Sequence, residues 1–380
     1  MLAIINAELI MRDHLIPEAV LFVEDGKIAG FGEMRNTPIP EGCEILDAKG
    51  AYVGPGLVDI HCHTGEDCQV WEDPVSAAAF HLSHGVTTLL PAFRGRMSVE
   101  ERLYASDVIR RVMDTPEGEN IGGVYMEGPY LNPGFGANRN NNPWDKPVLE
   151  EDYLPFVAAG AGIARVWCIA PERPDILPFV QEVRRHNPNI RFAVAHSEAT
   201  PQQIEELMPY GLSIGTHHTN ATGTIVKYPE CRGVCVDEAV NYNNDIYAEL
   251  ICDSRGIHVD PYMLRLVRKI KGDDRIILIS DRTCYNGPIP EGYEGVTDLN
   301  FDDEGEIAGS KLTLDIACQN YMKHTGASLV DIFRVASYNP ARATGFTDRG
   351  EIREGLRADL VFVDHKMNVS TVILGGKVKY

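Results

Sequence analysis

Pro55-Gly56-Leu57-Val58-Asp59-Ile60-His61-Cys62-His63 is an apolar run that ends in two histidines spaced one residue apart. Alternate side chains of a β-strand share a face, so His61 and His63 can reach one metal ion from the end of a buried strand. A chain with 12 histidines can also contain such a pair by chance. The rest of the sequence decides between a metal site and two packed or solvated histidines.

Size and composition narrow the class of protein. A chain of 380 residues has room for one α/β barrel of about 250 residues and a small companion domain. No run reaches the ~20 apolar residues that span a bilayer, and the first residues lack the pattern of a secretory signal. Nine cysteines without a paired Cys-x-x-Cys framework fit reduced thiols. We predict a cytoplasmic protein that does not bind membranes, and its net charge of -20 argues against nucleic acid.

The middle of the chain, from residue 55 to about 345, alternates short apolar runs with helical segments. This pattern predicts parallel strands joined by helical crossovers. Helices are expected at 99–113, 178–186, 201–208 and 261–271. Eight apolar runs predict a (β/α)₈ TIM barrel; they cover residues 57–61, 87–91, 121–127, 164–170, 191–196, 212–217, 246–253 and 276–281.

Both ends of the chain contain short strand-like runs instead. The first 54 residues hold four of them, and Asp25-Gly26 between two of the runs is a hairpin signal. Matching apolar runs lie at 358–363 and 372–378. We therefore predict a small β-sandwich domain formed by residues 1–54 and 347–380, with the barrel, residues 55–346, inserted between them.

Histidines and carboxylates stand at the ends of several predicted barrel strands. Active sites of such barrels are built at the carboxyl ends of the strands, which here carry His61, His63, Glu127, His196, His217 and Asp281. Four imidazoles and two carboxylates suit one or two borderline divalent ions, best zinc, and Glu127 could contact both. Asp281 could take a proton from an attacking water and deliver it to a leaving amine. The set predicts metal-assisted hydrolysis of an amide or a similar bond.

Several longer motifs point to a known family. They read Glu-Gly-Pro-Tyr-Leu-Asn-Pro at 127–133, His-Ser-Glu-Ala-Thr at 196–200, Thr-His-His-Thr-Asn-Ala at 216–221, Gly-Ile-His-Val at 256–259 and Ile-Ser-Asp at 279–281. With the opening stretch they resemble the N-acetylglucosamine-6-phosphate deacetylases of the amidohydrolase superfamily, over essentially the whole chain. The resemblance implies removal of the acetyl group from N-acetylglucosamine-6-phosphate, which gives an amino sugar phosphate and acetate.

The resemblance also implies residue roles. Glu127, His196 and His217 would hold the main metal ion, His61 and His63 a second one, and Asp281 would be the acid/base. The substrate contacts would be Ala137, Asn220, Ala221, His258 and the loop formed by Ile307, Ala308 and Gly309. Members of the family are usually homodimers, so a homodimer is expected.

Two stretches depart from the family pattern. The family binds the substrate phosphate with an arginine from the neighbouring subunit, and ungapped counting places Tyr228 at that position. Either Lys227 or Arg232 could replace it after a small shift, or the substrate carries no 6-phosphate. The polar stretch at 136–142 is the second departure. It is either an ordinary turn-rich loop or one in which Asn138 and Arg139 contact a different substrate.

Alternatives therefore stay open at this point. The same chemistry could act on another N-acyl substrate: a different amino sugar phosphate, an unphosphorylated amino sugar or an N-acyl amino acid. A barrel that has lost catalysis and only binds ligands is a third interpretation. Opening of a cyclic amide is disfavoured, because relatives of that type use a lysine at the end of the fourth strand and this strand continues Ala170-Pro171-Glu172.

Overall fold

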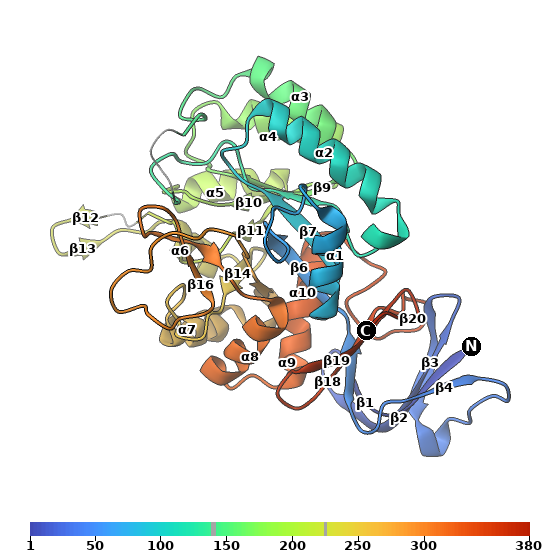
Figure 1. Cartoon of the computed structure of the whole chain (residues 1–380). Coiled ribbons are helices and arrows are strands. Elements are labelled where there is room, and N and C mark those ends of the chain that lie inside the picture. The colour runs from blue at the N-terminus through green and yellow to red at the C-terminus, as the bar shows by residue number, and fades with distance from the viewer. Residues whose placement is uncertain (138–141, 224–225) are drawn as a thin grey trace.

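Eight parallel strands form a barrel in the computed structural model, which describes residues 1–137, 142–223 and 226–380 (Figure 1). Each strand pairs with the next one along the chain. They are β6 (Leu57–Cys62), β7 (Val86–Phe93), β8 (Val124–Met126), β9 (Ala164–Ile169), β10 (Arg191–Val194), β11 (Leu212–Gly215), β14 (Tyr247–Ile251) and β15 (Ile276–Ile279). The predicted TIM barrel is confirmed, and every predicted strand is present.

The barrel closes between its first and last strands through residues of the candidate site. The Asp281 backbone N–H donates to the His61 carbonyl at 2.9 Å, and the His63 N–H donates to the Arg282 carbonyl at 2.9 Å. Every residue of β6, β7 and β15 is buried. Strands covered on both faces read as continuous apolar runs, which is why their sequences do not alternate between apolar and polar residues.

Helices cover the outside of the barrel (Figure 1). Local capping sets where they begin: Ser98 and Glu101 form a capping box at α2, and the Asp260 side chain caps the N–H of Tyr262 in α7. Both of these helices have the predicted bounds. The helices are α1 (Pro74–Ser83), α2 (Val99–Met113), α3 (Glu150–Gly160), α4 (Ile176–His186), α5 (Pro201–Leu207), α6 (Val236–Tyr242), α7 (Pro261–Lys271), α8 (Leu314–Thr325), α9 (Leu329–Phe333) and α10 (Asn339–Ala343).

The two chain ends meet in a separate sheet beside the barrel (Figure 1). Val361 of the C-terminal part pairs with Gly54 of the N-terminal part. The strands are connected through one hydrogen-bonded sheet, in which β1 pairs with β2 and also with β4 and β5, and the apolar side chains of this small domain form a core of their own. The strands are β1 (Leu2–Ile10), β2 (Leu15–Glu24), β3 (Lys27–Glu33), β4 (Glu44–Asp47), β5 (Tyr52–Pro55), β18 (Leu360–Val363), β19 (Val369–Leu374) and β20 (Lys377–Val378).

Two hairpins extend from the end of the barrel that carries the site. The strands β16 (Leu299–Phe301) and β17 (Ile307–Ser310) pack against it, since the Ser310 N–H donates to the Asp281 carbonyl at 2.8 Å. The strands β12 (Val226–Tyr228) and β13 (Cys231–Arg232) project from the barrel on the side away from the small sheet (Figure 1). None of the helices in the described part of the chain has the length and apolar character needed to cross a membrane.

Candidate active site

Three of the residues predicted as metal ligands or acid/base lie in an unusual backbone conformation. His196, His217 and Asp281 each lie two residues after the end of a barrel strand, with φ angles of 43°, 32° and 44°. Positive φ is uncommon for residues other than glycine, and such strain concentrates at functional sites. The three side chains line one cavity together with His63 and Glu127.

The Glu127 carboxylate lies at the centre of the predicted ligand set. Its Oε1 is 2.9 Å from His196 Nε2, 3.5 Å from His217 Nε2 and 3.9 Å from His61 Nε2. Its Oε2 is 3.5 Å from His63 Nε2. The structure thus brings together all five residues predicted as metal ligands. Asp281 adjoins the same group.

The histidine rings are oriented by their second nitrogen atoms. His63 Nδ1 lies 3.1 Å from the Ala92 carbonyl and His217 Nδ1 lies 3.2 Å from the Asn220 carbonyl. A carbonyl oxygen only accepts, so each Nδ1 carries a proton, and in the neutral form of each ring the Nε2 lone pair faces the cavity. This is the tautomer that binds a metal.

The residues present fit one or two divalent ions. The ligand atoms of His61, His63 and Glu127 lie within 4.8 Å of one another, and so do those of Glu127, His196 and His217. His61 Nε2 is buried without a hydrogen-bond partner, as expected of an atom that requires an additional ligand. A divalent ion held there would polarise an amide carbonyl and acidify a water molecule.

Opposite charges shift the pKa values of these groups. Burial raises the pKa of Glu127, but hydrogen bonds from His196 and His217 outweigh it and hold the pKa well below its usual value. Burial also raises the pKa of Asp281, and the His61 and His63 imidazoles reverse this shift and lower it. Burial lowers the pKa of His61, whereas Asp281 and Glu249 raise it, with a net result of about 9. Glu127 and Asp281 are therefore both ionised at neutral pH.

The cavity has a volume of about 390 Å³ and contains most of the predicted substrate contacts. Among its lining residues are Ala137, Asn220, Ala221, His258, Ile307, Ala308 and Gly309. Asn220 Nδ2 and His258 Nε2 are buried and have no hydrogen-bond partner within the described part of the protein. Asp253 Oδ2 fixes His258 through its Nδ1 atom at 3.2 Å. Two polar atoms are thus available to a ligand.

Three predicted substrate contacts stand apart from this group. Lys227 and Arg232 lie on the β12–β13 hairpin and do not belong to the described cavity lining. The Arg232 side chain is 80% exposed and pairs with Glu238 at 2.5 Å. Asn138 and its neighbour Arg139 lie outside the residues that the structure describes.

Glu249 is a further residue of the site that the sequence did not reveal. It lies within β14, fully buried, with Oε2 3.4 Å from His61 Nδ1 and 3.3 Å from the His217 backbone N–H. The Tyr125 hydroxyl donates to its Oε1 at 2.9 Å. One carboxylate therefore orients two predicted metal ligands from beneath. A carboxylate inside an otherwise apolar strand was the signal that could have found it.

Replacing Glu249 by Gln is expected to weaken metal binding and to lower kcat/KM by about 10- to 100-fold, the usual cost of losing a carboxylate behind a metal-binding histidine. The amide keeps the shape of the side chain but not its charge. Metal titration of the purified variant measures the first effect. Tyr125→Phe is the matched control, because it removes the hydroxyl and keeps the carboxylate. Unchanged metal affinity in Glu249→Gln would contradict this role.

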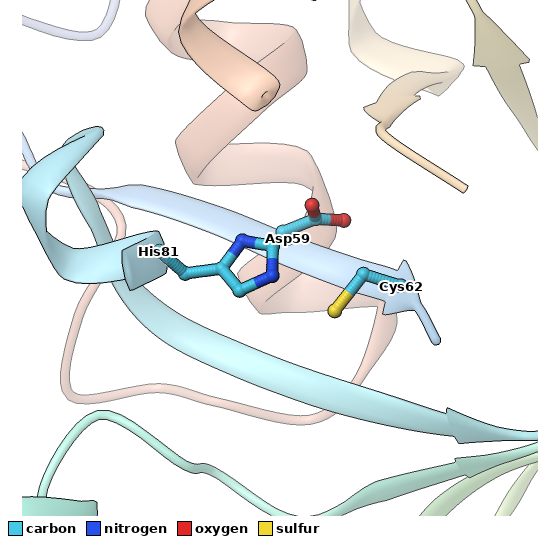
Figure 2. A group of neighbouring side chains, drawn as sticks. All are labelled: Asp59, Cys62 and His81. Atoms are coloured by element: carbon cyan, nitrogen blue, oxygen red, sulfur yellow. The ribbon is translucent and has the colours of Figure 1, made fainter. Parts of the chain in front are cut away.

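A second buried cluster lies beside the strand that carries the first histidines. Figure 2 shows the His81 ring of α1 beside Asp59 and Cys62 of β6. Asp59 Oδ1 accepts the His61 N–H at 3.2 Å and the Ser280 N–H at 3.4 Å, so it links the two strands that close the barrel. The three side chains lie within 4.8 Å of one another but do not border the cavity. We interpret the cluster as support for the backbone of the site.

The buried His81 side chain should make the folded protein less stable in acid. Its Nε2 donates to the Thr64 carbonyl at 2.9 Å, and burial lowers its pKa to about 4. Because protonation favours the unfolded chain, this contribution is present above pH 6.5 and is lost as the pH falls toward 4. Between pH 7 and 5 it amounts to about 2 kcal/mol. Denaturant unfolding at both pH values should show that His81→Gln, which can still donate to Thr64, loses correspondingly less stability than the wild type; equal losses would refute the prediction.

The fold and this site define a class of protein. The sequence model of the amidohydrolase family matches residues 52–379, so the chain belongs to the amidohydrolase family. The predicted resemblance and the predicted class, an enzyme that hydrolyses amide bonds, are confirmed at this level.

Individual relatives and solved structures show which members of the family this chain is similar to. The chain is 26% identical to N-acetylglucosamine-6-phosphate deacetylase of Lysinibacillus sphaericus, over 94% of this chain and 92% of that protein. It is also 26% identical to N-acetylgalactosamine-6-phosphate deacetylase of Escherichia coli O157:H7, over 97% of each. A mutant of N-acetyl-D-glucosamine-6-phosphate deacetylase from Mycobacterium smegmatis, solved with N-acetyl-D-glucosamine-6-phosphate, matches with a TM-score of 0.82 and 26% identity, covering 99% of this chain and 98% of that one.

Proposed function

We propose that this protein is a metal-dependent deacetylase that converts N-acetylglucosamine-6-phosphate into the amino sugar phosphate and acetate. The observation that carries the proposal is the convergence of four imidazoles on Glu127, with Asp281 next to His61 and His63. The similarity to deacetylases of amino sugar phosphates along nearly the whole chain supports the choice of substrate.

Asp281 is the proposed acid/base of the reaction. Its lowered pKa keeps the carboxylate ionised, so it can accept a proton from the attacking water. As the water oxygen bonds to the acetyl carbon, the bond between that carbon and nitrogen breaks, and Asp281 returns the proton to the leaving amine. Acetate and the free amine result, so no nucleophilic side chain is required.

We assign the roles of the other site residues from their positions in the site. His61, His63, Glu127, His196 and His217 would hold one or two ions, for which we propose zinc because nitrogen and oxygen ligands in this number suit it. Asn220 and His258 would bind the sugar through the buried atoms that have no protein partner. We further propose a homodimer, a cytoplasmic location, and domain boundaries at 1–54, 55–346 and 347–380.

Acetate release by zinc-reconstituted protein tests the proposal. The substrates are N-acetylglucosamine-6-phosphate, N-acetylgalactosamine-6-phosphate and the two unphosphorylated sugars. Preferred turnover of N-acetylglucosamine-6-phosphate would support it. Preference for the galactosamine epimer would change the sugar and keep the chemistry. No acetate from any of the four, with metal bound, would reject the proposal in favour of another N-acyl substrate or a binding protein.

A further inference from the structure

The wall of the cavity that follows β7 is basic, although the protein as a whole is strongly acidic. Arg94 and Arg96 come directly after this strand, and both line the cavity. The Arg94 guanidinium carbon lies 5.9 Å from the centre of the Trp71 ring and 5.7 Å from that of Tyr285. Its Nη1 donates to the Tyr285 hydroxyl at 3.1 Å. Two aromatic side chains therefore hold this guanidinium in place.

The backbone beneath Arg94 is also fixed. The buried Arg102 donates through Nη2 to the Arg94 carbonyl at 2.8 Å and to the Gly95 carbonyl at 3.0 Å. A Cβ atom at Gly95 would lie only 3.3 Å from the Glu127 carbonyl oxygen, so this segment packs directly against the segment that carries Glu127. Arg94 is thus held at a set position relative to the proposed metal ligands.

The Arg94 charge lacks a carboxylate partner in the described part of the chain. The nearby Glu101 accepts the Ser98 N–H at 2.7 Å as part of the helix cap. Glu127 and Asp281 face imidazoles instead. A guanidinium has five N–H donors arranged to bind an oxyanion, and Tyr285 occupies only one of them. The remaining donors are available to a ligand in the cavity.

We propose that Arg94 binds an oxyanion of the substrate, namely the phosphate of N-acetylglucosamine-6-phosphate, from within the same chain. This inference rests on the proposed function. It assigns the phosphate to a residue of the same chain, whereas Lys227 and Arg232, on the projecting hairpin outside this cavity lining, would have to reach it from a neighbouring subunit. The phosphate-bearing end of the sugar would then lie against the β7 wall, between Trp71 and Tyr285.

Kinetics of the zinc-loaded Arg94→Met variant test this assignment, with the phosphorylated and the unphosphorylated sugar measured side by side. Losing a charge-assisted hydrogen-bond pair should lower kcat/KM for the phosphorylated sugar by about 10- to 100-fold. The loss should appear mainly in KM, because the phosphate is remote from the reacting amide. The unphosphorylated sugar should react as with the wild type, and Arg94→Lys should recover only part of the loss.

Arg232→Met is the matched control, since it removes the same charge from the exposed hairpin. A selective loss in Arg232→Met and not in Arg94→Met would place the phosphate at the hairpin and overturn the inference. An equal loss for both sugars in Arg94→Met would also overturn it, because that result indicates a structural role.

Binding of glucose 6-phosphate separates this inference from the proposed function. If the wild type hydrolyses none of the acetylated sugars, the proposed function fails, and calorimetry with glucose 6-phosphate and glucose still tests Arg94. Phosphate-dependent binding that Arg94→Met abolishes would retain the oxyanion site in an enzyme with another substrate. Equal binding by both proteins would reject it.

Discussion

Replacing Asp281 by Asn is expected to lower kcat for acetate release by about 10³- to 10⁴-fold, near the upper range for loss of a general acid–base group. Asparagine keeps the shape of the side chain, but it cannot accept the proton of the attacking water or return it to the amine. Metal content should stay close to that of the wild type, because the two ligand sets that the structure brings together do not include Asp281. Steady-state kinetics and elemental analysis of the same preparations measure both quantities.

Asp315→Asn is the matched control for this substitution. Asp315 is a buried carboxylate that contacts His84 at 3.3 Å, and it does not line the described cavity. The same chemical change there should leave kcat within about twofold of the wild type, as for residues outside an active site. If Asp281→Asn kept more than a tenth of the wild-type kcat, another group would have to carry the proton.

Replacing Glu127 by Gln is expected to have the largest effect on metal binding. Glu127 belongs to both ligand sets, whereas His63 belongs to one of them. The loss of its charge should weaken both sets by more than the 10- to 100-fold that follows loss of an outer partner. Activity should fall with metal content. Elemental analysis after dialysis against a weak chelator gives the number of ions per chain.

His63→Asn provides the comparison for Glu127→Gln. It should spare the set formed by Glu127, His196 and His217, and so retain one ion if the wild type binds two. Full metal occupancy in Glu127→Gln would show that the carboxylate is not a ligand, and the assignment would then shift to the histidines alone.

The barrel was predictable because its signals are local. Strands buried on both faces appear as apolar runs, and the helices α2 and α7 have their capping residues, Ser98 and Asp260, directly before them in the sequence. The ends of the strands could be located for the same reason. The sequence could therefore predict that Glu127 and the histidines lie close together, as they do in the structure. The roles of these residues stay predictions until they are measured.

The rest of the site depends on contacts between distant segments. The role of Glu249 in the site depends on its contact with His61, which lies in a strand far away in the sequence. Arg94 depends on Trp71 and Tyr285 in two other loops. The placement of the β12–β13 hairpin likewise follows from loop geometry, which has no periodic signature. The register shifts between β1 and β2 are also not encoded by the apolar pattern.

The pairing of β5 with β18 has a consequence for biosynthesis. β5 emerges from the ribosome before the barrel, whereas β18, which covers its edge, is made only after the barrel. Until then the edge presents unpaired backbone groups to other nascent chains. Completion of the small sheet is therefore a late event of folding. Nascent chains halted before residue 360 should be more prone to self-association than the released protein.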